Sequence, residues 1–224
     1  MHPEIKKLET HALGLQMARA DACRLLAAFF YPPDKQLFLQ EGITEKLEAL
    51  LEIACPEAMS FVPPVKRYLQ GEGHVELSVA YTRLFLGPPS VLAPPYASFY
   101  LDHKGSVMGP SSIAIMKLYS AAGLRLDDEF NEMPDHIAVV LEFLYYLLFQ
   151  EAMVRNDNAY EEKTKIEKIR IRFLKNYSFT WIPRFCGKIV TADEHPVYTA
   201  LGNCLDAFIT YGFVKEKVGG HETV

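Results

Sequence analysis

The chain has 224 residues, half of them apolar, and a formal net charge of -5. This length and composition are enough for a sizeable core in one large domain. The acidic balance argues against broad binding to the phosphate backbone of nucleic acids. The amino-terminal residues contain no apolar run of signal-peptide length, so we expect a cytoplasmic protein.

The four cysteines are far apart in the sequence: Cys23, Cys55, Cys186 and Cys204. No CxxC or HxxxH spacing is present, so a zinc site would need ligands from distant elements. A chain of this length with ordinary core residues does not need disulfides. We therefore predict free buried thiols and no metal site.

Helical periodicity dominates the first part of the chain. Apolar residues recur at helical spacing from Leu8 to Phe30, and the prolines at 32 and 33 end this predicted helix. Thr44 is a plausible N-cap for a second helix, which ends before Pro56. Two more helices are predicted over residues 65–70 and 75–86.

Residues 87–110 contain five prolines and three glycines and are predicted to be non-helical. A connection of this length inside a compact helical domain usually serves a function or is disordered. Its aromatic content argues against disorder. A structural connection and a binding segment both fit this composition.

The second part of the chain again predicts helices. Ser111 or Ser112 is the expected N-cap of a helix that Gly123 ends in a left-handed conformation. Further helices are predicted over residues 137–149, 159–175 and 196–214. Strand-like alternation is nearly absent, so we predict an all-α fold with a single compact domain over residues 1–224.

Residues 137–149 are apolar or aromatic except for Glu142. Thirteen helical residues cover roughly 20 Å, less than the ~30 Å hydrocarbon core of a membrane. An apolar helix of this length belongs in a soluble core, so we expect no stable membrane insertion.

The start of this helix carries ionisable residues but no internal acid–base couple. Pro134 suits a first helical turn, and Asp135 suits the positive end of a helix dipole. Asp135 and Glu142 are separated by about 10 Å along the axis, and His136 and Glu142 by about 120° around it. The alternative is a purely structural role for all three residues. Asp135 would then stabilise the helix start, and His136 and Glu142 would each be hydrogen-bonded within the protein.

Sequence motifs of common enzymes are missing. There is no GxSxG nucleophile motif and no GxxxxGK[ST] phosphate-binding loop. No catalytic constellation and no cofactor-binding motif can therefore be read from the sequence.

Three segments together resemble the TorD/DmsD-type chaperones that mature redox enzymes: YTRLFLGP (81–88), PPYASFYLDHKGSVMGP (94–110) and EMPDHIAVVLEFLYYL (132–147). The resemblance implies an all-helical cytoplasmic protein that binds the twin-arginine signal peptide, and sometimes the body, of an apo-form molybdenum-cofactor oxidoreductase of the dimethyl sulfoxide reductase type. It implies binding without catalysis, with no catalytic residue, no bound cofactor and no enzymatic activity. It also implies that export of the client is delayed until the client's cofactor is inserted. It also implies that a domain-swapped homodimer is accessible, with a hinge at 87–110.

Carried over by position, the resemblance implies a signal-peptide site formed by Tyr100, Asp102, Gly105, Met108, Gly109, Pro134, Asp135, His136 and Glu142. Two positions depart from the pattern. Many relatives carry a glutamate where this chain has Val140, and another where it has Ala97. Both departures remove negative charge that could meet an arginine.

Acidic residues also gather just before the Pro-Asp-His turn: Asp127, Asp128, Glu129, Glu132 and Asp135. Arginine prefers paired, fixed carboxylates, so Asp128 and Glu132 join the predicted site. Tyr96, Phe99, Tyr100 and Met108 are expected to line a groove for the apolar part of the peptide. The alternative to a binding site is that the acidic residues form a solvated loop and the aromatic side chains fill the core.

A second functional hypothesis is a helical enzyme or small-molecule binder that uses the Pro-Asp-His turn. Its ligand could be a nucleotide, since the helix start at residues 109–112 offers backbone N–H groups to a phosphate.

Overall fold

The computed structural model describes residues 3–71, 77–87, 90–102, 107–125, 132–154 and 160–214, with side-chain surroundings from residue 10 onward. Its helices are α1 (Pro3–Ala28), α2 (Lys35–Gln40), α3 (Ile43–Ala54), α4 (Pro56–Met59), α5 (Val62–Gln70), α6 (Leu77–Tyr81), η1 (Thr82–Leu86), α7 (Ala97–Leu101), α8 (Pro110–Ala121), α9 (Ile137–Met153), α10 (Tyr160–Phe173), η4 (Leu174–Ser178), α11 (Ile182–Ala192) and α12 (Pro196–Tyr211). Both η elements are π-helices. Extended pairing in the described residues is limited to one bridge, between Tyr96 and His136. The predicted all-α fold is confirmed.

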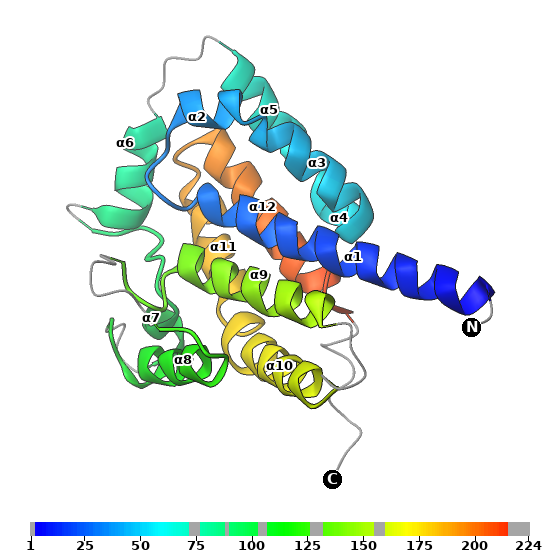
Figure 1. Cartoon of the computed structure of the whole chain (residues 1–224). Coiled ribbons are helices and arrows are strands. Elements are labelled where there is room, and N and C mark those ends of the chain that lie inside the picture. Colours follow the sequence, from blue (N-terminus) through cyan, green and yellow to red (C-terminus); the bar gives the residue numbers. More distant parts are fainter. Residues whose placement is uncertain are drawn as a thin grey trace.

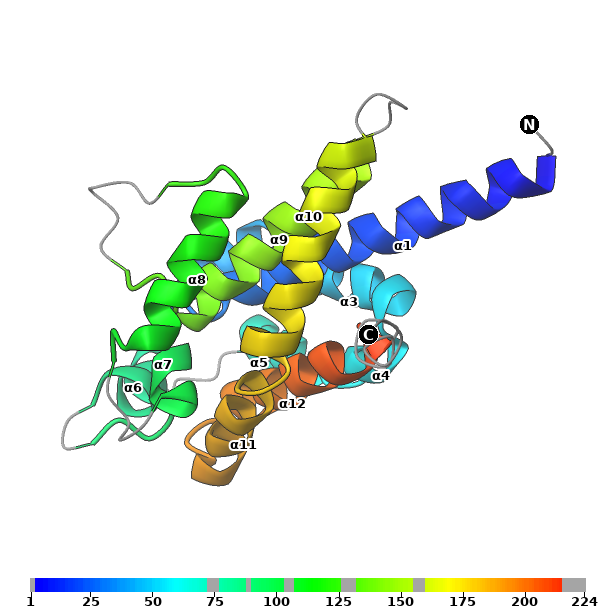
Figure 2. The ribbon, with the colours of Figure 1, turned by 90° about the horizontal axis from the view of Figure 1, so that it is seen from below.

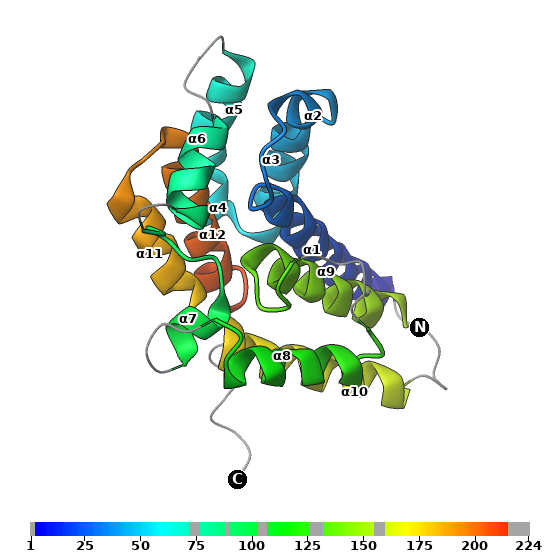
Figure 3. The same ribbon diagram turned by 90° about the vertical axis from the view of Figure 1, so that its left-hand side faces the viewer.

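Helix α9 lies at the centre of the fold. Figure 3 shows it between α1 on one side and α8 and α10 on the other. A second group, in which α11 and α12 pack together and α4 and α5 pack on α12, lies behind α1 in Figure 1. The amino-terminal turns of α1 extend beyond the other helices (Figure 2). Buried apolar side chains form one cluster that reaches from Ala18 to Phe213.

The composition of α9 explains its central position. Most of its side chains are buried, in agreement with its almost continuous apolar sequence. The less buried residues recur every three or four positions and form one stripe: Glu142, Tyr145, Tyr146, Phe149, Gln150 and Met153. The helix therefore has a half-exposed face, and its glutamate at position 142 lies on that face.

A buried ion pair joins α9 to α10, and the sequence did not predict it. Arg170 donates to both carboxylate oxygens of Glu151, at 2.7 and 3.3 Å, and both side chains are buried. Such a pair stabilises the packing of the two helices only while both partners are present.

Two predicted helix caps are wrong. Thr44 lies inside α3, whose N-cap is Gly42 in a left-handed conformation with φ of 58°. That conformation turns the chain from α2 directly into α3. Neither Ser111 nor Ser112 caps α8, because Gly109 is the N-cap and Pro110 occupies the first helical position. Gly123 follows α8 with φ of 84°, as predicted.

The predicted non-helical segment 87–110 contains a helix. Residues Ala97–Leu101 form α7, and Pro110 already belongs to α8. The prediction was wrong for this segment because the group that stabilises the start of α7 comes from a part of the chain 37 residues later, as described below.

Candidate functional site

The Pro134-Asp135-His136 turn packs against residues 95–98 by backbone hydrogen bonds. The N–H of Ala97 donates to the carbonyl of Asp135 at 2.9 Å, and the N–H of Ile137 donates to the carbonyl of Pro95 at 2.8 Å. The hydroxyl of Tyr119 donates to the carbonyl of Pro134 at 2.6 Å. Two of the three segments that carry the family resemblance, 94–110 and 132–147, are thus joined directly.

Asp135 is fully buried and holds the start of α7. Its Oδ2 accepts a 2.8 Å hydrogen bond from the N–H of Ser98, in the first turn of that helix. The sequence placed Asp135 in the first turn of the following helix, but α9 begins at Ile137. Pro134 likewise lies in the turn before α9. In this conformation the Asp135 carboxylate positions the 95–98 segment and is closed to solvent.

His136 is the N-cap of α9. Its Nδ1 accepts a 3.2 Å hydrogen bond from the N–H of Ala138, so the imidazole is neutral with its proton on Nε2. The ring lies between those of Tyr31 and Tyr96, at centroid distances of 6.1 and 5.5 Å. Burial lowers the pKa of His136 to about 4. The residue therefore adds no positive charge to the site at neutral pH.

Glu142 meets Tyr31, a residue that the sequence analysis did not select. The Tyr31 hydroxyl donates to the carboxylate of Glu142 at 3.0 Å, and both side chains are half-buried. Burial raises the pKa of Glu142, and the hydrogen bond from Tyr31 opposes that increase. The available signal was a tyrosine directly before two prolines, because a proline restricts the backbone conformation of the residue before it.

Glu132 is the second carboxylate at this place. Burial raises the pKa of Tyr31, Tyr81 and Tyr96, and the Glu132 carboxylate adds to the increase in all three. Glu132 therefore lies within electrostatic reach of each ring. The acidic–aromatic cluster is the name used below for five residues: Tyr31, Tyr96, Glu132, His136 and Glu142.

Four further predicted residues lie at the junction of α7 and α8: Tyr100, Asp102, Met108 and Gly109. Tyr100 is buried, stacks on Trp181 at 5.7 Å, and accepts a hydrogen bond from Arg184 Nη1 at its carbonyl. Met108 is exposed. Gly105 and Asp128 lie outside the described residues. The structure thus separates the buried Tyr100 from the acidic–aromatic cluster.

Asp102 and Gly109 connect α7 to α8. The Asp102 carboxylate accepts from the N–H of Ser111 at 3.1 Å and from its Oγ at 2.5 Å. A Cβ at position 109 would clash with that carboxylate, which explains the glycine. The same contact disfavours the phosphate-binding hypothesis at this helix start, because an internal anion already holds the Ser111 N–H.

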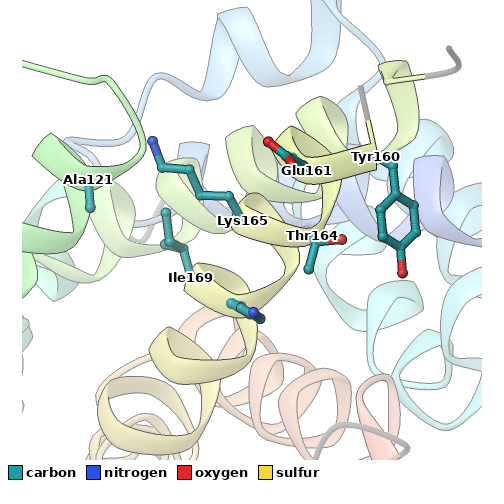
Figure 4. A pocket seen from close by; sticks show the side chains of 7 residues that line it. Ala121, Tyr160, Glu161, Thr164, Lys165 and Ile169 are labelled. Carbon is teal, nitrogen blue, oxygen red and sulfur yellow. The ribbon is translucent and has the colours of Figure 1, made fainter. Parts of the chain in front are cut away.

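A cavity of about 490 Å³ lies on another part of the molecule, along α10 (Figure 4). Its lining contains none of the predicted site residues and consists of Ala121, Tyr160, Glu161, Thr164, Lys165, Lys168 and Ile169.

Within the described ranges, no group of three or more His, Cys, Asp or Glu side chains is arranged to hold a metal ion. The four cysteines are free and buried, as predicted.

Among the described residues, no helix combines the length and apolar content that a membrane-spanning segment needs.

Comparison with known proteins gives a consistent result. Residues 39–187 match the family described as nitrate reductase delta subunit. The chaperone protein TorD of Photobacterium profundum is 33% identical over 138 residues, which are 61% of this chain and 62% of that protein. The Tat proofreading chaperone DmsD of Salmonella typhi is 25% identical over 183 residues, covering 82% of this chain and 83% of its own.

A solved structure has the same fold. It is a candidate redox enzyme maturation protein from Archaeoglobus fulgidus, with 26% sequence identity and a TM-score of 0.51, covering 85% of this chain and 92% of its own. The alignments with the TorD relatives span less than two thirds of the length of those proteins. The resemblance to TorD/DmsD-type chaperones is confirmed, and the chain belongs to the nitrate reductase delta subunit family.

Proposed function

We propose that this protein is a cytoplasmic assembly chaperone and not an enzyme. Its client is an apo-form molybdenum-cofactor oxidoreductase of the dimethyl sulfoxide reductase type, which it holds by the twin-arginine signal peptide until the cofactor is inserted. The names of the TorD and DmsD relatives support the chaperone part of this proposal. The acidic–aromatic cluster is the single observation that supports the choice of ligand.

The cluster has the chemistry that a guanidinium group requires. Arginine presents planar N–H donors that match carboxylates and also stacks on aromatic rings. Glu132 and Glu142 supply the carboxylates, and Tyr31 and Tyr96 supply the rings. The neutral state of His136 avoids repulsion of the incoming cation. Lysine lacks the planar fork, so the cluster favours arginine over lysine.

The buried members of the predicted site act indirectly in this proposal. Asp135 holds the start of α7, and this contact keeps Tyr96 beside His136. Asp102 and Gly109 hold the start of α8. These residues position the surface that meets the peptide and do not contact the arginines themselves.

Binding of a synthetic peptide with two adjacent arginines, measured by calorimetry, tests the proposal. The Glu142→Gln variant is expected to bind about 10- to 100-fold more weakly, because a hydrogen bond to a charged group contributes ~1.5–3 kcal/mol. Glu167→Gln on the exposed face of α10 removes the same charge elsewhere and is the matched control. An equal loss of affinity in the two variants would show that only the net charge of the protein matters, and it would contradict the assigned site.

A further inference from the structure

The cavity beside α10 is bordered by lysines and has an apolar floor. Lys165 and Lys168 are exposed on α10, and the Lys165 side chain extends toward Ala121 of α8 in Figure 4. Ile169, one position after Lys168, is buried and supplies part of the floor. A space of about 490 Å³ is large enough to receive the side chains of a partner.

Two further cations extend this basic surface. Arg172 is exposed and lies four residues after Lys168, so both are on one face of α10. On α8, the exposed Lys117 lies four residues before Ala121 and therefore shares a face with that cavity-lining residue. The two helices run in opposite directions (Figure 2 and Figure 3), which places Lys117 toward the Arg172 end of the cavity. The cavity with Lys117, Lys165, Lys168 and Arg172 is called the basic groove below.

The basic groove carries charge that the described residues do not balance. None of the ion pairs in the described part of the chain includes one of its four cations. Other cations of the chain do have such partners: Lys46 pairs with Glu41 at 3.3 Å, and Lys66 with Glu48 at 3.4 Å. A cleft lined by charge of one sign attracts ligands of the opposite sign. The basic groove therefore favours an anionic ligand, although the chain as a whole has a net charge of -5.

The arrangement of the cations favours an extended ligand over a compact one. Lys165, Lys168 and Arg172 follow one another along about 10 Å of the α10 axis, so they do not converge on a single phosphate group. Carboxylates that recur every three or four residues of a helix have the same spacing. The apolar floor matches the apolar side chains of such a helix, and a cavity suits it better than it suits a flat membrane surface. The acidic net charge disfavours nucleic acid.

We infer that the basic groove binds an acidic amphipathic helix of a partner protein, whose carboxylates meet the cations while its apolar side chains enter the cavity. Glu161, the one carboxylate in the cavity lining, lies in the first turn of α10 and repels acidic residues there. The charges of the ligand are therefore placed toward Lys168 and Arg172. A twin-arginine leader has the wrong sign of charge for this surface. The basic groove is thus a second binding site, and the inference does not depend on the function proposed above.

Fluorescence anisotropy with a labelled synthetic helix of glutamate, leucine and alanine tests this inference. The helix carries glutamates at every third or fourth position and leucines on the adjoining face. Measurable binding that weakens with added salt is expected. The Lys165→Gln/Lys168→Gln double variant is expected to lose about 2- to 30-fold in affinity, because each exposed ion pair contributes modestly. Lys163→Gln/Lys188→Gln removes two charges from exposed positions outside the cavity lining and is the matched control.

Ala121→Gln tests the cavity itself without changing a charge. Ala121 is exposed, so the longer side chain is expected to leave the melting temperature unchanged while it enters the cavity and weakens binding of the acidic helix about 3- to 10-fold. Absence of binding to the unsubstituted protein would overturn the inference, as would equal losses in the two double variants or undiminished binding in Ala121→Gln. Preferential binding of phosphatidylglycerol vesicles or inorganic triphosphate, lost in Lys165→Gln/Lys168→Gln, would assign the basic groove to a membrane surface or a phosphate and would also overturn it.

Discussion

The hydroxyl of Tyr31 donates a 3.0 Å hydrogen bond to the carboxylate of Glu142, joining the residues that follow α1 to the half-exposed face of α9. The two residues are separated by 111 positions in the sequence. This contact explains how Glu142 is accommodated within the apolar run of residues 137–149. It also fixes a carboxylate and an aromatic ring side by side at the candidate site.

Removal of that hydroxyl is expected to weaken the fold modestly. Tyr31→Phe should lower the free energy of unfolding by about 1 kcal/mol, since one side-chain hydrogen bond is lost from a half-buried position. Urea denaturation measures this change. Tyr160→Phe removes the same group from a largely exposed residue and should leave the stability unchanged. A loss of the same size in both variants would contradict the assigned contact.

Asp135 is expected to act through the structure of α7. Asp135→Ala should lower the free energy of unfolding by about 1–3 kcal/mol, because the buried N–H of Ser98 loses its acceptor. Asp135→Asn should cost less, since its amide oxygen can still accept that hydrogen bond. Chemical denaturation of the three proteins provides the comparison. Equal stability of Asp135→Ala and the unsubstituted protein would show that the hydrogen bond from Ser98 to Asp135 contributes nothing.

Stability is expected to depend on the ionisation of His136. Its folded pKa of about 4 lies below the ordinary value of 6.5, so the unfolded chain binds more protons between these two values. The stabilising contribution is therefore complete above about pH 6.5 and is lost as the pH falls toward 4. Its size is on the order of 3 kcal/mol.

His136→Asn isolates this contribution, since asparagine caps a helix without titrating in that range. Thermal melts between pH 4 and pH 7.5 should show a melting temperature that depends less steeply on pH in the variant than in the unsubstituted protein. Part of this pH dependence should persist in the variant, because burial also lowers the pKa of His195, which caps α12 in the same manner. Identical slopes in the two proteins would contradict the assignment.

The ion pair between Glu151 and Arg170 is expected to be the most sensitive polar contact of the α9–α10 interface. Glu151→Ala should cost about 3–5 kcal/mol, because it leaves a buried guanidinium without its carboxylate. Glu162→Ala, at an exposed position of α10, should change the stability by less than about 0.5 kcal/mol. Similar midpoints of unfolding for the two variants would refute this expectation.

The long helices could be predicted from sequence because their signal is local. The apolar periodicity of α1 and the almost continuous apolar run of α9 specify helices without reference to distant residues. Helix α7 could not be predicted in this way. Its five residues follow a proline-rich stretch, and its start is stabilised by Asp135, far along the chain.

The same distinction between local and distant signals applies to the candidate site. His136 and Glu142 were selected from a short motif, and the structure brings them to one place through Tyr31. The burial of Asp135 could not be predicted, because an aspartate before a helix usually faces solvent and the residues that cover this one come from another segment. Tertiary contacts therefore decide which members of the motif meet a ligand.

The central claim is that the acidic–aromatic cluster recognises paired arginines, and one calorimetric comparison tests it most directly. The twin-arginine peptide is titrated into the protein beside the same peptide with both arginines replaced by lysine. The account predicts measurable binding of the first and a marked loss with the second, because charge is retained while the planar donors are removed. Equal affinity for the two peptides would contradict it.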